Sequence, residues 1–136
     1  MKVVLDTNVL ISALVFPGGL PGKIYGLALE GEIALVTSAP LLVELARVLA
    51  NKFGWARSRI DRALKQLLRV AELVEPSVTI NEVRADPADN RVLEAAAESN
   101  AEVIVSGDRH LVRLKAWRGI PIESPAAFVV RLGKPA

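Results

Sequence analysis

Short runs of β-branched and aliphatic residues alternate along this chain with segments of helical periodicity. This alternation predicts βαβ units, in which the strands run parallel and helices cover both faces of the sheet. Hydrophobic residues make up 51% of the 136 residues, which suits a sheet that is buried on both faces. Because no repeat, low-complexity tract or linker interrupts the pattern, we expect one α/β domain over residues 1–136.

The expected elements follow from hydrophobic spacing and from the residues that interrupt it. In the segment 57–71, for example, Ile60, Leu64 and Leu67 recur at helical spacing. Strands are expected at residues 2–5, 33–36, 72–75, 102–105 and 120–123. Helices are expected at residues 9–15, 21–30, 39–53, 57–71, 87–99, 109–116 and 125–132.

The composition excludes several kinds of site. The chain has no cysteine, so it can form neither a disulfide framework nor a thiolate zinc site. Its one histidine, His110, excludes a pair of histidines acting as acid and base within one chain. The N-terminal stretch has one lysine and then Asp6, unlike a signal peptide, and no segment approaches the roughly 18 apolar residues of a membrane span. A cytoplasmic location is therefore expected.

Two of the predicted strands end in aspartate. The first is followed by the polar triplet Asp6-Thr7-Asn8, and a carboxylate there either caps the next helix or carries chemistry. Asp108 likewise follows the predicted strand that contains Val103. In open parallel sheets the functional crevice lies beyond the carboxyl ends of the strands. Two aspartates at that edge are a stronger indication of a site than either one alone.

A third acid lies on the apolar face of a predicted helix. Asp89 precedes Val92 and Leu93 by three and four positions, so it shares their face. A carboxylate facing the core is costly unless it is paired, hydrogen-bonded or bound to a cation. Placement in the first turn of a helix is the structural alternative. Asp86, which stands before Pro87, is interpreted as the N-cap of the same helix.

Glu44 lies in the predicted helix 39–53, at the border of its buried stripe and within reach of the same edge. Thr37 or Ser38 is expected to cap this helix, and Pro40 fits its first turn. A boundary glutamate with no chemical role is the alternative for Glu44 taken alone.

Taken together, the four acids come from four separate elements near one edge of the sheet. Like charges that meet in this way repel, and a hard divalent cation would neutralise them. Ligation by oxygen alone suits Mg²⁺ or Mn²⁺. Such a cation activates water and stabilises charge on a phosphoryl oxygen, so the pattern favours hydrolysis of a phosphodiester.

Basic residues form two groups that suit a polyanionic substrate. Between residues 47 and 69 there are seven basic residues and one acid, and a second group lies between residues 109 and 118. Solvated helix faces are the alternative for either group. The residues expected to contact RNA phosphates are Arg62, Lys65, Arg69, Arg109 and Arg113.

The sequence resembles PIN-domain proteins, and among them the VapC-like toxins of bacterial and archaeal toxin–antitoxin systems. The resemblance covers about residues 2–130, and the matching segments are Val4–Ser12, Glu44, Asp86–Asp89 and Val103–Leu111. It implies a Rossmann-like, three-layer α/β/α fold with about five parallel strands, and a toxin that cleaves RNA with Mg²⁺ or Mn²⁺. It also implies a cognate antitoxin and a homodimer.

The resemblance also assigns roles to residues. The catalytic, metal-binding acids would be Asp6, Glu44, Asp89 and Asp108, with Asn8 and Ser106 orienting the site. Many relatives have a further acid two positions after the last aspartate, where this chain has His110. His110 could contact the metal site, contact RNA or simply be a solvated side chain.

Three other classes of protein match part of this pattern. A haloacid-dehalogenase-type phosphatase needs a second aspartate two positions after the first, where this chain has Asn8. A receiver domain needs a phosphorylatable aspartate after the third strand, where the chain reads Leu73-Val74-Glu75-Pro76. The more serious alternative is a non-catalytic RNA-binding or scaffold protein of the same fold, in which all four acids are present but badly positioned.

Overall fold

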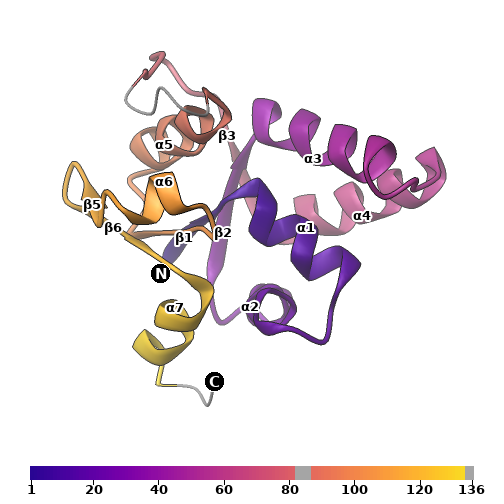
Figure 1. Ribbon diagram of the computed structural model, residues 1–136, viewed down its shortest axis with the longest axis horizontal. Coiled ribbons are helices and arrows are strands. Elements are labelled where there is room, and N and C mark those ends of the chain that lie inside the picture. The colour runs from indigo at the N-terminus through magenta and orange to yellow at the C-terminus, as the bar shows by residue number, and fades with distance from the viewer. Residues whose placement is uncertain (82–86, 134–136) are drawn as a thin grey trace.

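The computed structural model of the protein describes residues 1–81 and 87–133, and the fold of these residues is a sheet with helices on both faces (Figure 1). In chain order the elements are β1 (Lys2–Leu5), α1 (Thr7–Val15), α2 (Leu20–Leu29), β2 (Ala34–Ser38), α3 (Ala39–Asn51), α4 (Arg57–Val70), β3 (Ala71–Val74), α5 (Pro87–Ser99), β4 (Val103–Val105), α6 (Arg109–Val112), β5 (Ala116–Trp117), β6 (Ile120–Glu123) and α7 (Pro125–Arg131).

The strands form a single sheet in the order β3-β2-β1-β4-β6-β5. The first five strands of this order pair in parallel, and only β5 is antiparallel to its neighbour. The expected α/β fold with about five parallel strands is confirmed. From β1 the chain adds β2 and β3 on one side and later β4 and β6 on the other. The topological switch point, where such sheets bind ligands, is therefore at the carboxyl ends of β1 and β4.

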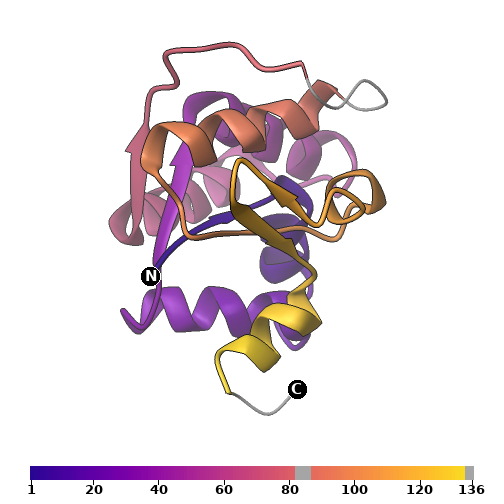
Figure 2. The same cartoon turned by 90° about the vertical axis from the view of Figure 1, so that its left-hand side faces the viewer.

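Each face of the sheet has its own apolar core. Val3 and Leu5 of β1 belong to the core that includes residues of α1, α2 and α7, whereas Val4 belongs to the core beneath α5. Figure 2 shows α5 on one side of the sheet, with α2 and α7 on the other. This alternation along a strand fixes the face on which each later side chain lies.

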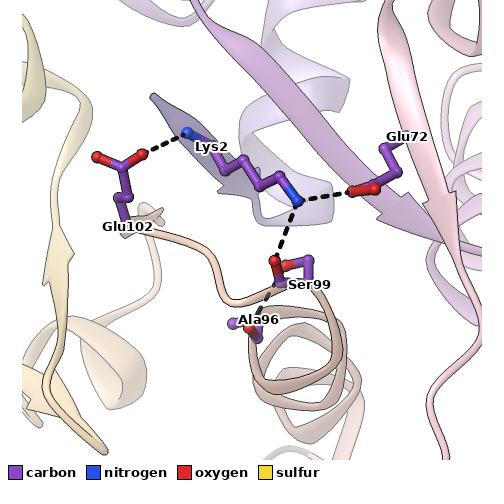
Figure 3. A network of polar contacts seen from close by, with 5 residues as sticks. All are labelled: Lys2, Glu72, Ala96, Ser99 and Glu102. Carbon is purple, nitrogen blue, oxygen red and sulfur yellow. Dashed lines mark hydrogen bonds and ion pairs between the residues drawn. The ribbon is translucent and has the colours of Figure 1, made fainter.

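Polar contacts join three elements at the amino edge of the sheet (Figure 3). The Nζ atom of Lys2 in β1 lies 3.4 Å from a carboxylate oxygen of Glu72 in β3 and donates to the carbonyl oxygen of Ser99 at the end of α5 (3.3 Å). Since α5 ends at this edge, it begins near the opposite, carboxyl edge. The first turn of α5 thus lies on the same side of the molecule as the switch point.

The expected helix 109–116 is too long, because α6 ends at Val112 and a hairpin follows. Strands β5 and β6 are joined by Arg118 and Gly119, whose φ values are 49° and 79°. Two residues with positive φ form the tight turn that suits the twist of a hairpin. Strand β5 has only two residues, so it leaves almost no periodic signal in the sequence.

No single helix among the described residues has the length and hydropathy needed to cross a membrane. Helices α1 and α2 reach these values only jointly, with a bend of 94° between them.

Candidate active site

Asp6 lies at the switch point, directly after β1. Its backbone N–H donates to the carbonyl oxygen of Val105 (2.9 Å), so the backbone of β1 still pairs with β4 at this residue. The side chain is 5% exposed, and although Asp6 is the N-cap residue of α1, its carboxylate makes no capping hydrogen bond. It accepts a hydrogen bond from the hydroxyl of Ser106 instead (2.6 Å). Asp6 thus occupies the N-cap position of α1, but capping does not account for its bond to Ser106.

Ser106 connects the two aspartates that follow strands. Its hydroxyl oxygen accepts from the backbone N–H of Asp108 (2.9 Å) while the hydroxyl donates to Asp6. The carboxylate of Asp108 in turn accepts from the backbone N–H of His110 (2.7 Å), so Asp108 caps α6. The side chain of His110 is exposed.

Asn8 holds the loop that follows β4. Its side-chain oxygen accepts from the backbone N–H of Gly107 (3.4 Å). This contact links the start of α1 to the segment between Ser106 and Asp108. The geometry is consistent with a role for Asn8 and Ser106 in orienting the acids.

Glu44 reaches the same region from α3. It is partly buried, at the border of the helix's apolar stripe, and its carboxylate accepts a hydrogen bond from the Thr7 hydroxyl (3.3 Å). Thr7 was not identified from the sequence as a site residue. The available signal was its place between Asp6 and Asn8, in a polar triplet within an apolar stretch.

Asp89 lies in the first turn of α5 and is 4% exposed, so its expected position on the buried face of the helix is confirmed. Helix α5 packs against β1, β2 and β4, the strands that form the switch-point region. Asp86, which was expected to be the N-cap of this helix and to support the site, lies outside the described residues.

The electrostatics of the site centre on Asp6. Burial raises the pKa of Asp6 from 3.8 to about 6, against the hydrogen bonds from the Ser106 hydroxyl and the Thr7 backbone N–H, which lower it. The negative charges of Asp108 and Glu44 raise the pKa of Asp6 further. The carboxylates of Asp108 and Glu44 therefore lie close enough to Asp6 for their charges to affect its protonation.

The donor set suits a hard cation, because every candidate ligand is an oxygen atom. Asp6 is buried, already disfavours its own charge and faces two other negative groups, so a divalent cation would relieve an unfavourable arrangement. Within residues 1–81 and 87–133, however, no three acidic or histidine side chains are grouped closely enough to hold a metal ion as they stand. Convergence of the four acids on one cation stays a prediction.

The two basic groups lie in different places. Arg109 and Arg113 line a hollow of about 390 Å³ that also includes Ser106, the residue bonded to Asp6. Arg62, Lys65 and Arg69 line a separate hollow on α4, and Arg69 also borders one that includes Met1 and Ala34, at the amino edge of the sheet. Arg109 and Arg113 thus share a hollow with the residue bonded to Asp6.

A buried acid outside this set has a structural role. Glu94 of α5 accepts from the backbone N–H of Ile80 (2.8 Å) and forms an ion pair with Arg91 (2.9 Å). Arg91 in turn donates to the carbonyl oxygen of Ile80 (3.1 Å). These contacts fasten the segment after β3 to α5. Sequence reasoning missed Glu94, although its place between the apolar residues Leu93 and Ala95 was a signal.

The fold and the site define a class of protein that comparison with known families identifies. Residues 2–110 match the PIN domain family, a range that contains all four candidate acids, and the chain belongs to this family.

Among individual proteins, the uncharacterized protein MJ1680 of Methanocaldococcus jannaschii is 38% identical over 119 residues, which cover 85% of this chain and 76% of that protein. The fold is similar to a chain of VapBC2 from Rickettsia felis, whose crystal structure contains a promoter DNA fragment. The TM-score is 0.66 at 17% identity, covering 91% of this chain and 98% of that one. The fold is also similar to that of PAE2754 from Pyrobaculum aerophilum, with a TM-score of 0.55 at 18% identity. The match covers 98% of this chain and 90% of that one.

Proposed function

We propose that this protein is a divalent-cation-dependent endoribonuclease that acts on cytoplasmic RNA as the toxin of a toxin–antitoxin pair. The observation that supports this best is the state of Asp6. It is a buried carboxylate at the switch point of a PIN-domain sheet, bonded to Ser106 and facing the charges of Asp108 and Glu44. A carboxylate kept in such surroundings has a functional rather than a structural explanation.

Asp6, Asp89 and Asp108, with Glu44 at the border, would hold the cation. When bound, Mg²⁺ or Mn²⁺ would activate a water molecule for attack on phosphorus and stabilise charge on the phosphoryl oxygens.

The protein's own residues prepare this site in separate ways. Ser106 fixes the orientation of the Asp6 carboxylate, and Asn8 fixes the loop that leads to Asp108. Arg109 and Arg113, which border the same region, would contact RNA phosphates on either side of the cleaved bond.

The toxin role has a separate basis. A chain of VapBC2, whose crystal structure contains a DNA fragment from its promoter, shares this fold. We propose by analogy that an antitoxin binds this protein and blocks its acidic site, and that the protein forms a homodimer.

Cleavage assays on a single-stranded RNA and on DNA of the same sequence test the activity. We expect RNA cleavage with Mn²⁺ or Mg²⁺, none with EDTA, and none by Asp6→Asn or Asp108→Asn. Asp61→Asn, which changes an exposed acid on α4, is the matched control and should cleave normally. RNA binding without cleavage under all metal conditions would instead favour the non-catalytic RNA-binding protein.

A further inference from the structure

Two neighbouring residues at the end of β2 carry buried hydroxyl groups that form no hydrogen bond within the described part of the chain. They are Thr37, which is 1% exposed, and Ser38, which is fully buried. Buried hydroxyl groups normally have a partner, because taking them out of water without one is unfavourable. Each of these two groups therefore requires an explanation.

The two hydroxyls lie on opposite faces of the sheet. Leu35 belongs to the core that includes α1 and α2, whereas Val36 belongs to the core beneath α5. Continued alternation along β2 places Thr37 on the first face and Ser38 on the α5 face. The two residues are thus alike in burial and in lacking a partner but differ in what they face.

Ser38 lies beside Asp6. Val4 of β1 packs beneath α5, so Asp6, two residues later, lies on the same face as Ser38. The register pairs Val4 with Val36, which brings Asp6 and Ser38 to neighbouring positions at the carboxyl edge. Ser106 occupies the corresponding position on the other side of Asp6 and donates to it. The carboxylate therefore stands between two serines, and only Ser106 is bonded to it.

The expected structural role of Ser38 does not account for its hydroxyl. Ser38 occupies the N-cap position of α3, as expected, yet its side chain makes no capping hydrogen bond. Pro40, the second residue of α3, has no N–H to offer. The hydroxyl is thus buried, uncommitted and next to the central acid of the site.

We propose that Ser38 is a positioning residue of the cation site, whose hydroxyl holds the hydration shell of the cation next to Asp6. This inference rests on the proposed function and extends the set of site residues to β2. It gives the Ser38 hydroxyl the partner that the described part of the chain does not supply. Thr37, on the opposite face, has no such role and serves as the matched control.

The test is a Mn²⁺ titration without RNA, in which electron paramagnetic resonance measures the free ion. The proteins compared are the wild type, Ser38→Ala and Thr37→Val. We expect Ser38→Ala to weaken Mn²⁺ binding about tenfold, the scale typical of residues that support metal ligands. Thr37→Val should bind Mn²⁺ like the wild type.

Thermal melts without metal separate this role from a structural one. Both variants lose a hydroxyl that has no hydrogen-bond partner among the described residues, so neither should melt below the wild type. If Ser38 were merely structural, Ser38→Ala would melt at a lower temperature and the folded variant would bind Mn²⁺ normally.

The outcomes are distinguishable. Equal Mn²⁺ affinity in the wild type and Ser38→Ala would overturn the role of Ser38 and leave the proposed function standing. Equal losses of affinity in Ser38→Ala and Thr37→Val would also overturn it, because the effect would not depend on the face of the sheet. A wild type that binds no Mn²⁺ would overturn both proposals.

Discussion

Replacing Asp6 by asparagine removes a charge that the folded protein holds at a cost. Burial, with the charges of Asp108 and Glu44, raises the pKa of Asp6 from 3.8 to about 6. The folded state therefore binds a proton more tightly than the unfolded state does, and ionised Asp6 destabilises the fold at neutral pH. The difference corresponds to about 3 kcal/mol, since a tenfold change in a protonation constant is worth about 1.4 kcal/mol.

Asparagine keeps the shape of the side chain and an oxygen that can accept from Ser106, but that hydrogen bond is weaker without the charge. We therefore expect Asp6→Asn to stabilise the metal-free protein at pH 7 by about 1–3 kcal/mol. For a chain of this length, that gain would raise the melting temperature by about 4–10 °C.

A bound cation should reverse the order of the two melting temperatures, so that the wild type melts above Asp6→Asn. A ligand that binds only the folded state stabilises it by RT ln(1 + [L]/Kd), so Mn²⁺ should raise the melting temperature of the wild type. Asp6→Asn should lose most of this rise together with RNA cleavage. The assay is a set of thermal melts with and without Mn²⁺, with Asp61→Asn as an exposed control that should follow the wild type in both conditions. A less stable metal-free Asp6→Asn protein with an undiminished Mn²⁺ shift would refute the reasoning.

The same pKa predicts a pH dependence of stability. Because the folded-state pKa of Asp6 is raised, its contribution is fully favourable only below pH 3.8 and is lost as the pH rises towards about 6. The free energy of unfolding of the wild type relative to Asp6→Asn should thus fall across this window and level off above it. Urea titrations at several pH values measure this difference. A difference that does not change between pH 4 and 7 would contradict the raised pKa.

Three further predictions concern RNA binding, the fold and assembly. Charge reversal at both Arg109 and Arg113 should weaken RNA binding. It should also reduce the slope of log K against log salt concentration by about 1.4, because two phosphate contacts to a single strand are lost. Arg69→Glu, at the opposite edge of the sheet, should change neither the affinity nor the slope. Glu94→Ala should destabilise the protein by about 1–3 kcal/mol and speed amide hydrogen exchange at Ile80, because the backbone N–H of Ile80 loses its acceptor. An unchanged exchange rate at Ile80 would contradict the hydrogen bond between Ile80 and Glu94. Light scattering should give twice the 14.6 kDa mass of one chain, and a monomer at micromolar concentration would count against the homodimer.

Local pattern was enough to predict the class of the fold, because helical and strand periodicities differ and each is visible within a few turns or strands. It also predicted that Asp6 and Asp108 follow parallel strands at the same edge of the sheet and that Asp89 is buried on its own helix. The hairpin of β5 and β6 escaped prediction because a two-residue strand and a two-residue turn are too short to show a period.

What the sequence by itself determined is therefore the kind of sheet, the edge at which a site would form and the acids expected there. The partners of those acids were decided only by tertiary structure. The Ser106 hydroxyl bonds to Asp6 across 100 positions, and the hydroxyl of Ser38 was brought beside Asp6 by the register of two strands. The location of the basic residues was likewise decided by tertiary structure, since the basic pattern of α4 does not reveal which edge of the sheet these residues approach. Contacts between distant segments depend on strand order and register, which no local run of residues encodes.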